Sequence, residues 1–189
     1  MGFEGDIKEA LTTLREGGII LYPTDTIWGI GCDATNPSAV EKIFRIKSRS
    51  ESKSLIILVN GEQMIEQYVQ DIPEITYELT AISDKPLTII YPTGKNLADG
   101  ICSKDGSIGI RICHDKFCHE LISRFKKPIV STSANFTGKP ASEKFSVIDK
   151  SLKESVDYIV KHRQNDKCNH AASQIIRVEI NGIIKIIRE

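Results

Sequence analysis

The segment LYPTDTIWGIGCDA, residues 21–34, ends an apolar run with three consecutive polar side chains, Thr24, Asp25 and Thr26. The run begins at Ile19, and an uninterrupted apolar strand is typical of a sheet that helices cover on both faces. In open α/β sheets, ligands bind at strand ends. Here the hydroxyls would form a polar pocket, and Gly29 and Gly31 would let a ligand approach the backbone. The same residues would also form a simple turn in which Asp25 bonds to its own backbone. The segment by itself leaves both interpretations open.

Predicted helices and strands alternate along most of the chain. Residues 4–16 place Ile7, Leu11 and Leu14 on one helical face, and two glycines then end this helix. Asn-Gly joins the last two predicted strands, which is a strong hairpin signal. These patterns predict an α/β protein with a single domain over residues 1–189, built on a mixed sheet. Further helices are expected at residues 36–49, 61–69, 117–125 and 145–156, and strands at residues 19–23, 54–60, 86–92, 106–113, 127–135, 157–160, 173–180 and 182–189.

Composition limits the classes of protein that fit. The chain has 189 residues, with 25 Lys and Arg against 25 Asp and Glu. This balance offers no overall field for a polyanion, so any contact with nucleic acid or nucleotide depends on a local patch. Five unevenly spaced cysteines in a chain rich in Ile and Leu favour reduced thiols. The sequence shows no signal peptide and no membrane-spanning run, so we expect a soluble cytoplasmic protein. Residues 161–172 are polar and irregular, and we expect them to form a mobile loop.

A basic stretch, RIKSRSESKSL, covers the end of the helix predicted at residues 36–49. Extended spacing beyond the helix end would aim Lys47 and Arg49 toward the same side, where they could clamp a triphosphate. The alternative is a solvated helix end whose bases favour the negative pole of the helix dipole. Both interpretations place the two side chains at the protein surface.

Two further stretches combine polar groups with apolar strands. PIVSTSANFTGKP delivers Ser131, Ser133 and Asn135 directly after a buried strand. This density of small donors suits an anion or a carboxylate, and we prefer it to the alternative of a plain polar turn. Arg111 lies inside the apolar strand IGIRIC, where an arginine is costly unless it is paired. It therefore either reaches solvent from a strand edge or meets a carboxylate, which a ligand could supply.

Other sequence signatures of chemistry are missing. The chain has neither the phosphate-binding loop GxxxxGK[ST] nor the dinucleotide fingerprint GxGxxG. CHDKFCHE and CNH supply cysteines and histidines but no CxxC spacing, and Cys113 is expected to pack as a small hydrophobe. A metal site is therefore not expected among Cys113, His114, Cys118, His119, Cys168 and His170.

Taken in order, YPTDTIWGIGCDA, IFRIKSRSESKSLIILV, GSIGIRI and PIVSTSANFTGKPA resemble the YrdC-like family of threonylcarbamoyl-AMP synthases, in its short bacterial form. The likeness runs from about Gly17 to the last residue, and the ordered set of strings is much more specific than any one of them. The resemblance implies a YrdC-like fold, in which helices flank a twisted mixed parallel and antiparallel sheet around a concave basic cavity. It implies that L-threonine, bicarbonate and ATP, with Mg²⁺, give threonylcarbamoyl-adenylate and pyrophosphate. It also implies a partner transferase complex that moves the threonylcarbamoyl group to the adenosine beside the tRNA anticodon.

The resemblance assigns roles to individual residues. The implied L-threonine contacts are Thr24, Arg111, Ser131 and Ser173. The implied ATP contacts are Lys47, Arg49, Ser107, Ser133, Asn135 and Arg188. In this scheme Arg111 pairs with the threonine carboxylate, and Mg²⁺ arrives with ATP near Ser133 and Asn135 without a protein cage. Such chemistry needs no protein nucleophile, because Lys47 and Arg49 would neutralise charge while the reactants are held together.

Two other functions remain open from the sequence. One is a carbamoyl-adenylate-forming domain of the hydrogenase-maturation type, although the zinc-finger and acylphosphatase-like modules of those proteins are not seen in this sequence. The other is a module that binds double-stranded RNA or tRNA by shape and phosphate contacts. Zero net charge and few aromatic residues rank the RNA hypothesis second.

Overall fold

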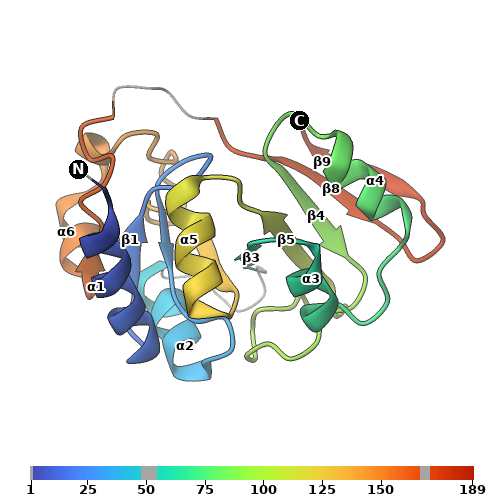
Figure 1. Ribbon diagram of the computed structural model, residues 1–189, viewed down its shortest axis with the longest axis horizontal. Helices are drawn as coiled ribbons and strands as arrows, with labels where there is room; N and C mark the ends of the chain where they lie inside the picture. The colour runs from blue at the N-terminus through green and yellow to red at the C-terminus, as the bar shows by residue number, and fades with distance from the viewer. Residues whose placement is uncertain (1, 48–54, 167–170) are drawn as a thin grey trace.

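The computed structural model describes residues 2–47, 55–166 and 171–189, and these form one mixed sheet with the strand order β7-β1-β2-β6-β3-β5-β4-β8-β9 (Figure 1). The strands are β1 (Ile20–Tyr22), β2 (Gly29–Gly31), β3 (Ile56–Val59), β4 (Leu87–Tyr91), β5 (Ile108–Ile112), β6 (Ile129–Ser133), β7 (Tyr158–Ile159), β8 (Gln174–Val178) and β9 (Ile184–Arg188). The helices are α1 (Glu4–Arg15), α2 (Pro37–Lys47), α3 (Glu62–Tyr68), α4 (Ile75–Ile82), α5 (Lys116–Phe125) and α6 (Lys150–Glu154), with a 3₁₀ turn at Phe145–Val147. The predicted α/β class and mixed sheet are confirmed.

Strand direction changes repeatedly across the sheet. β1 and β7, β3 and β5, and β4 and β8 pair in parallel, while the other neighbours are antiparallel. β8 and β9 form the predicted hairpin, and Gly182 in its turn has a φ of 80°, which glycine adopts without strain. The hairpin confirms that Asn-Gly marks the turn between the last two strands.

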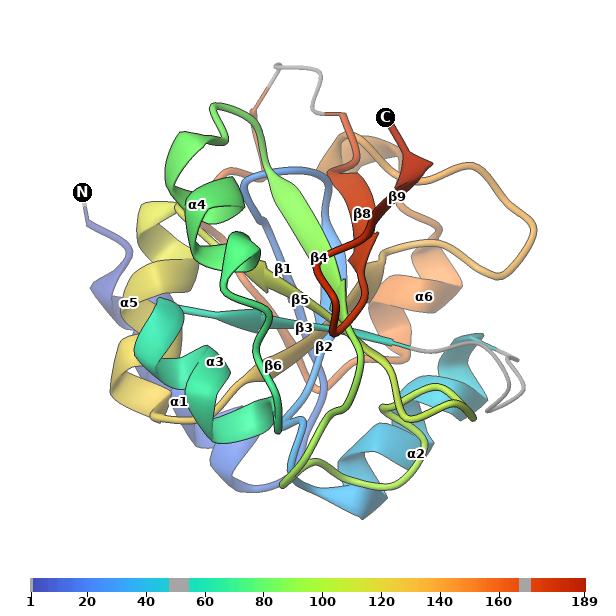
Figure 2. The same ribbon diagram turned by 90° about the vertical axis from the view of Figure 1, so that its right-hand side faces the viewer.

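Helices gather around both ends of the sheet. In Figure 1, α1, α2, α5 and α6 lie at the end that holds β1, and α3 and α4 lie toward the end that holds β4, β8 and β9. Figure 2 shows this second end from its own side, with the β8–β9 hairpin beside β4. Ile7, Leu11 and Leu14 of α1 are buried, as their helical spacing predicts. Burial of this face stabilises α1 against its neighbours α5 and β1.

Three local elements differ from the sequence prediction. Strand β2 was not predicted; its Gly31 makes room for the Val130 carbonyl oxygen, which would lie only 2.2 Å from a Cβ. Helix α4 was not predicted either. The helix predicted at residues 145–156 is confirmed only for its second half, as α6, because the backbone is extended at Ile148 after the 3₁₀ turn. Asp149 then starts α6 by accepting a hydrogen bond from the Ser151 backbone N–H at 2.9 Å.

The described part of the predicted mobile loop is held by a carboxylate from α1. Asp6 accepts hydrogen bonds from the backbone N–H groups of Lys161 at 3.0 Å and His162 at 2.8 Å. Asp6 is itself buried, so these bonds are shielded from water. Lys161 and His162 are therefore tied to α1, while residues 167–170 lie outside the described residues.

The described cysteines and helices bear on two features of the composition. The cysteines at positions 32, 102, 113 and 118 are free thiols, as the prediction of reduced cysteines requires. Within the described ranges, no helix combines the length and apolar character needed to cross a membrane.

Candidate functional site

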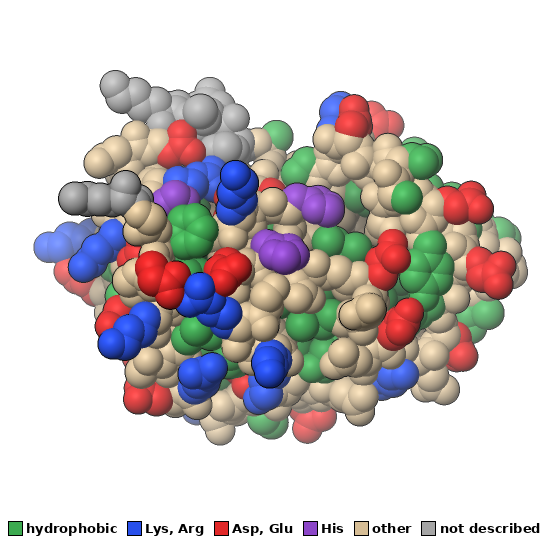
Figure 3. Space-filling model, viewed as in Figure 1, with side chains coloured by type: hydrophobic (Ala, Val, Ile, Leu, Met, Phe, Trp, Pro, Cys, Tyr) green, Lys and Arg blue, Asp and Glu red, His purple; other side chains and the backbone are tan. Residues whose placement is uncertain are grey.

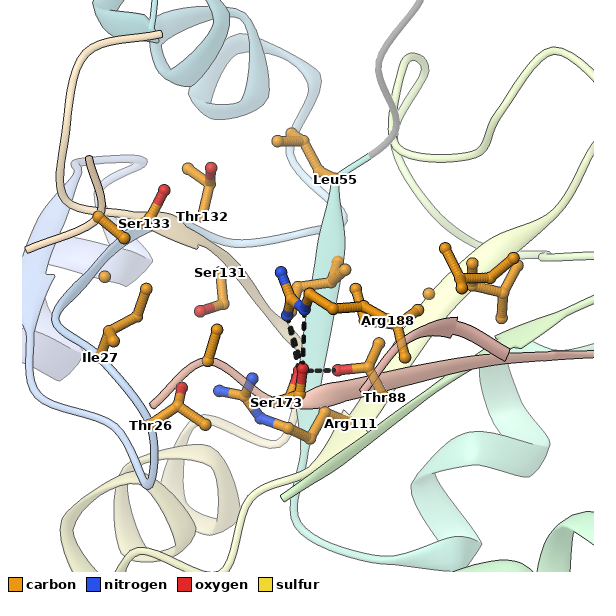
Figure 4. A pocket seen from close by; sticks show the side chains of 18 of the residues that line it. Thr26, Ile27, Leu55, Thr88, Arg111, Ser131, Thr132, Ser133, Ser173 and Arg188 are labelled. Atoms are coloured by element: carbon orange, nitrogen blue, oxygen red, sulfur yellow. Dashed lines mark hydrogen bonds between the residues drawn. The ribbon is translucent and has the colours of Figure 1, made fainter. Parts of the chain in front are cut away.

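A cavity of about 330 Å³ lies where the turn after β1 meets strands from the middle and the β9 end of the sheet (Figure 4). Its wall is partly apolar, with Ile56, Ile90, Ile175 and Ile187 from four different strands. Among the described lining residues the only charged ones are two arginines, and none is acidic. The lining residues with hydroxyl or guanidinium groups are Thr26, Thr88, Arg111, Ser131, Thr132, Ser133, Ser173 and Arg188.

Arg111 meets a carboxylate of the protein, which is one of the two outcomes expected for a cation in this strand. Its Nη2 lies 3.1 Å from Asp25 Oδ1, with the side chains 4% and 10% exposed. The contact lacks the alignment of a hydrogen bond: both Asp25 carboxylate oxygens and Arg111 Nε have no hydrogen-bond partner. Arg111 is therefore charge-balanced by Asp25 but retains an unused N–H donor, which is unusual for a buried guanidinium.

Arg188 enters the cavity from β9. Its Nε and Nη2 donate to the Ser173 carbonyl at 3.0 and 2.7 Å, and the Ser173 hydroxyl lies 2.8 Å from that of Thr88 (Figure 4). Burial lowers the pKa of Arg188, and the charge of Arg111 lowers it further. The two guanidiniums therefore repel each other, and an anion between them would relieve that repulsion.

The Thr24 hydroxyl holds the turn after β1. It donates to the Ile27 carbonyl at 2.8 Å, accepts from the Thr26 backbone N–H at 3.1 Å, and lies 2.9 Å from the Thr26 hydroxyl. Thr24 is 1% exposed, and it is Thr26 that lines the cavity. Residues 21–34 thus form both of the structures that their sequence allowed, a hydrogen-bonded turn and part of a polar cavity wall.

Lys47 is buried, so its expected place at the protein surface is wrong. It is the last residue of α2, and its ammonium donates to the Ser133 carbonyl at 2.7 Å, to Asn135 Oδ1 at 3.0 Å and to the Asn135 carbonyl. The Lys47 carbonyl in turn accepts from the Thr137 hydroxyl at 2.6 Å. Neither the solvated helix end nor an exposed phosphate clamp describes Lys47, because it ties α2 to the turn after β6.

Two of the remaining predicted residues are described and do not line the cavity. The hydroxyl of Ser107, which is buried, donates to Asp105 at 2.6 Å, and Ser107 does not line the cavity. Asn135 is held by Lys47 and does not line the cavity either. Arg49 lies outside the described residues.

Five of the residues with an implied substrate contact lie on the cavity wall, and Thr24 lies behind one of them, accepting a hydrogen bond from Arg111 Nη2 at 3.5 Å. The predicted residues on the cavity wall are Arg111, Ser131, Ser133, Ser173 and Arg188. Sequence reasoning included Thr26 among the hydroxyls of a possible pocket and gave Asp25 only a role in a turn, and it gave no role to Thr88. Thr88 could have been noticed as the single hydroxyl in the middle of the apolar run PLTIIYP. Asp25 could have been noticed because it follows Thr24 directly in the sequence.

Ser133 and Asn135 do not fit a role as ligands of Mg²⁺. Asn135 Oδ1 already accepts from the Lys47 ammonium and the Ser133 hydroxyl. A second cation at these oxygens would be repelled by the first. Among the described residues, moreover, no three His, Cys, Asp or Glu side chains are grouped to hold a metal ion.

Relatives of known name share most of the chain. A threonylcarbamoyl-AMP synthase of Photobacterium profundum is 31% identical over 158 residues, which cover 82% of this chain and 85% of that protein. A protein of the same name from Saccharophagus degradans is 33% identical over 138 residues, which cover 72% of each chain.

Solved structures share the fold. P. abyssi Sua5 complexed with L-threonine superposes with a TM-score of 0.82 at 25% identity, covering 93% of this chain and 51% of the Sua5 chain. This chain thus spans about half the length of that protein. E. coli YciO has a TM-score of 0.80 at 21% identity, covering 98% of this chain and 89% of YciO, which supports the fold alone. The profile of the Sua5/YciO/YrdC family, described as "Telomere recombination", matches residues 12–189, and the chain therefore belongs to this family.

Proposed function

We propose that this chain is a threonylcarbamoyl-AMP synthase, which forms L-threonylcarbamoyladenylate and pyrophosphate from L-threonine, bicarbonate and ATP. The names of its relatives support this activity. The observation that carries it is the buried Arg111 guanidinium on a cavity wall that also holds the hydroxyls of Thr26 and Ser131. A planar guanidinium pairs well with a carboxylate, and nearby hydroxyls suit an amino acid that itself bears a hydroxyl.

The remaining polar groups suit the nucleotide. Arg188 keeps its charge close to the cavity without a neighbouring carboxylate within the described residues, so it would meet a phosphate. Carbamate formation and adenylation need reactants held together and negative charge neutralised, which arginines and hydroxyls supply without a nucleophile. Lys47 would act indirectly, by fixing the Ser133 backbone. Mg²⁺ would enter with the ATP phosphates and would not bind Ser133 and Asn135.

The product and its use complete the proposal. The threonylcarbamoyl group would pass to a tRNA-modifying transferase complex in the cytoplasm, for attachment to the adenosine beside the anticodon. An RNA-binding module is not favoured, because Lys and Arg on the face in Figure 3 are interspersed with Asp and Glu. Arg124, for example, is paired with both Glu4 and Glu120. Such mixed charge gives no extended basic surface on this face for a phosphate backbone.

A direct assay tests the proposal. Purified protein is incubated with labelled bicarbonate, L-threonine, ATP and Mg²⁺, and a labelled adenylate is separated and counted. We expect the adenylate and pyrophosphate to appear together, and only when both L-threonine and bicarbonate are present. Pyrophosphate release at the same rate with ATP alone would overturn the proposal.

A further inference from the structure

The two arginines of the cavity differ in their counter-ions. Arg111 has Asp25 at 3.1 Å, and both side chains are at least nine-tenths buried. The described partners of Arg188 are the neutral carbonyl and hydroxyl of Ser173. No carboxylate lies within 4.0 Å of Arg188 in the part of the chain that the structure describes. Arg111 is therefore charge-balanced, and Arg188 carries an uncompensated positive charge.

Asp25 is placed to act on a ligand only through Arg111. Arg111 and Thr26 line the cavity, whereas Asp25 does not and its carboxylate oxygens are buried. A ligand in the cavity would thus touch the guanidinium and feel the carboxylate behind it. No hydrogen bond aligns the pair, so Asp25 acts on Arg111 through its charge.

We infer that Asp25 determines which anion Arg111 accepts, making Arg111 a site for a carboxylate monoanion and excluding phosphate dianions. The inference rests on the proposed function, in which one pocket must hold an amino-acid carboxylate beside a nucleotide. Without such a device, two neighbouring guanidiniums would both prefer the more highly charged phosphates. With Asp25 in place, the phosphates are directed toward Arg188.

Charge number provides the discrimination. A ligand oxygen bonded to Arg111 would lie roughly 6 Å from the Asp25 carboxylate, one hydrogen-bond length beyond the guanidinium. Coulomb repulsion scales with ligand charge, so a dianion is repelled twice as strongly as a monoanion at the same distance. At an effective dielectric constant near 20, each added charge weakens binding by roughly a hundredfold. Removing the Asp25 charge should therefore raise phosphate affinity relative to threonine affinity by at least about tenfold.

Calorimetric titration of L-threonine, with and without inorganic phosphate at matched ionic strength, tests the inference on the full chain. In the parent protein, phosphate should leave the threonine Kd nearly unchanged. In Asp25→Asn, phosphate should compete, so that the apparent threonine Kd rises with phosphate concentration. Asp25→Glu keeps the charge and should behave like the parent. Asp33→Asn is the matched control, because Asp33 is also buried and ion-paired, but with Lys127 and away from the cavity wall.

Each outcome decides the inference. Equal phosphate competition in parent and Asp25→Asn would overturn it, as would competition in Asp25→Glu or Asp33→Asn. If Asp25→Asn does not fold, Asp25→Ser is tested in its place, since serine does not bury an amide group. If neither variant folds, the inference is overturned and Asp25 has a scaffold role. If the parent binds no threonine, the proposed function fails instead. Titration of phosphate alone into parent and variant then still tests whether Asp25 repels a dianion.

Discussion

Replacing Lys47 by Met tests whether this buried ammonium supports the cavity wall. Methionine keeps most of the aliphatic stem and removes the charge that bonds to Ser133 and Asn135. Hydrogen bonds from a charged donor contribute roughly 1.5–3 kcal/mol each, and water can replace part of this at acceptors that are only half-buried. We therefore expect the free energy of unfolding to fall by about 2–4 kcal/mol, and the Tm by roughly 5–12 °C.

Urea and thermal unfolding of both proteins provide the measurement, with ATP titration alongside. Lys150→Met is the matched control, because the Lys150 side chain is 89% exposed and its ion pair with Glu154 is long, at 3.6 Å. This substitution should change the free energy of unfolding by less than about 0.5 kcal/mol. ATP affinity should also fall in Lys47→Met, since the Ser133 backbone would lose its anchor. Unchanged stability combined with weaker ATP binding would refute this reasoning and return Lys47 to a direct phosphate contact.

The other predictions concern four side chains. Arg111→Lys keeps the charge but loses the planar fork, so it should raise the threonine KM roughly ten- to a hundredfold while changing the ATP KM much less; an equal change in both constants, in a variant that melts like the parent, would exclude a specific carboxylate contact. Thr24→Val removes the hydroxyl that holds the turn and should lower the free energy of unfolding by about 1–2 kcal/mol, whereas Thr26→Val should mainly weaken threonine binding. Melting and titration experiments in which Thr24→Val mainly weakened threonine binding and Thr26→Val mainly lowered stability would contradict these two roles. Hydrogen bonds from Ser107 and then the charge of Arg177 lower the pKa of Asp105 to about 2, below its unfolded value, so its contribution is present above about pH 4 and is lost as pH falls toward 2. Asp105 is half exposed, and after allowance for solvent Asp105→Asn should cost about 1 kcal/mol at pH 7 and almost nothing near pH 2; a cost independent of pH in unfolding experiments would exclude the charge as its cause.

The long elements were predictable because their signals are local. The apolar spacing of Ile7, Leu11 and Leu14 defines the buried face of α1, and Asn-Gly at residues 181–182 defines the last hairpin. The order of polar groups at strand ends also indicated a site, since Arg111, Ser131 and Ser133 do line one cavity.

Tertiary structure alone decided which of these groups meet and what each one does. Strand β2 has three residues, two of them glycine, and exists because β1 and β6 pair with it on either side. Burial of the Lys47 ammonium depends on carbonyls from the turn after β6, and the charge balance of Arg111 depends on Asp25 from the turn after β1. Periodicity along a chain reports which face of an element is buried, whereas hydrogen bonds and ion pairs depend on partners that the fold brings from distant parts of the chain.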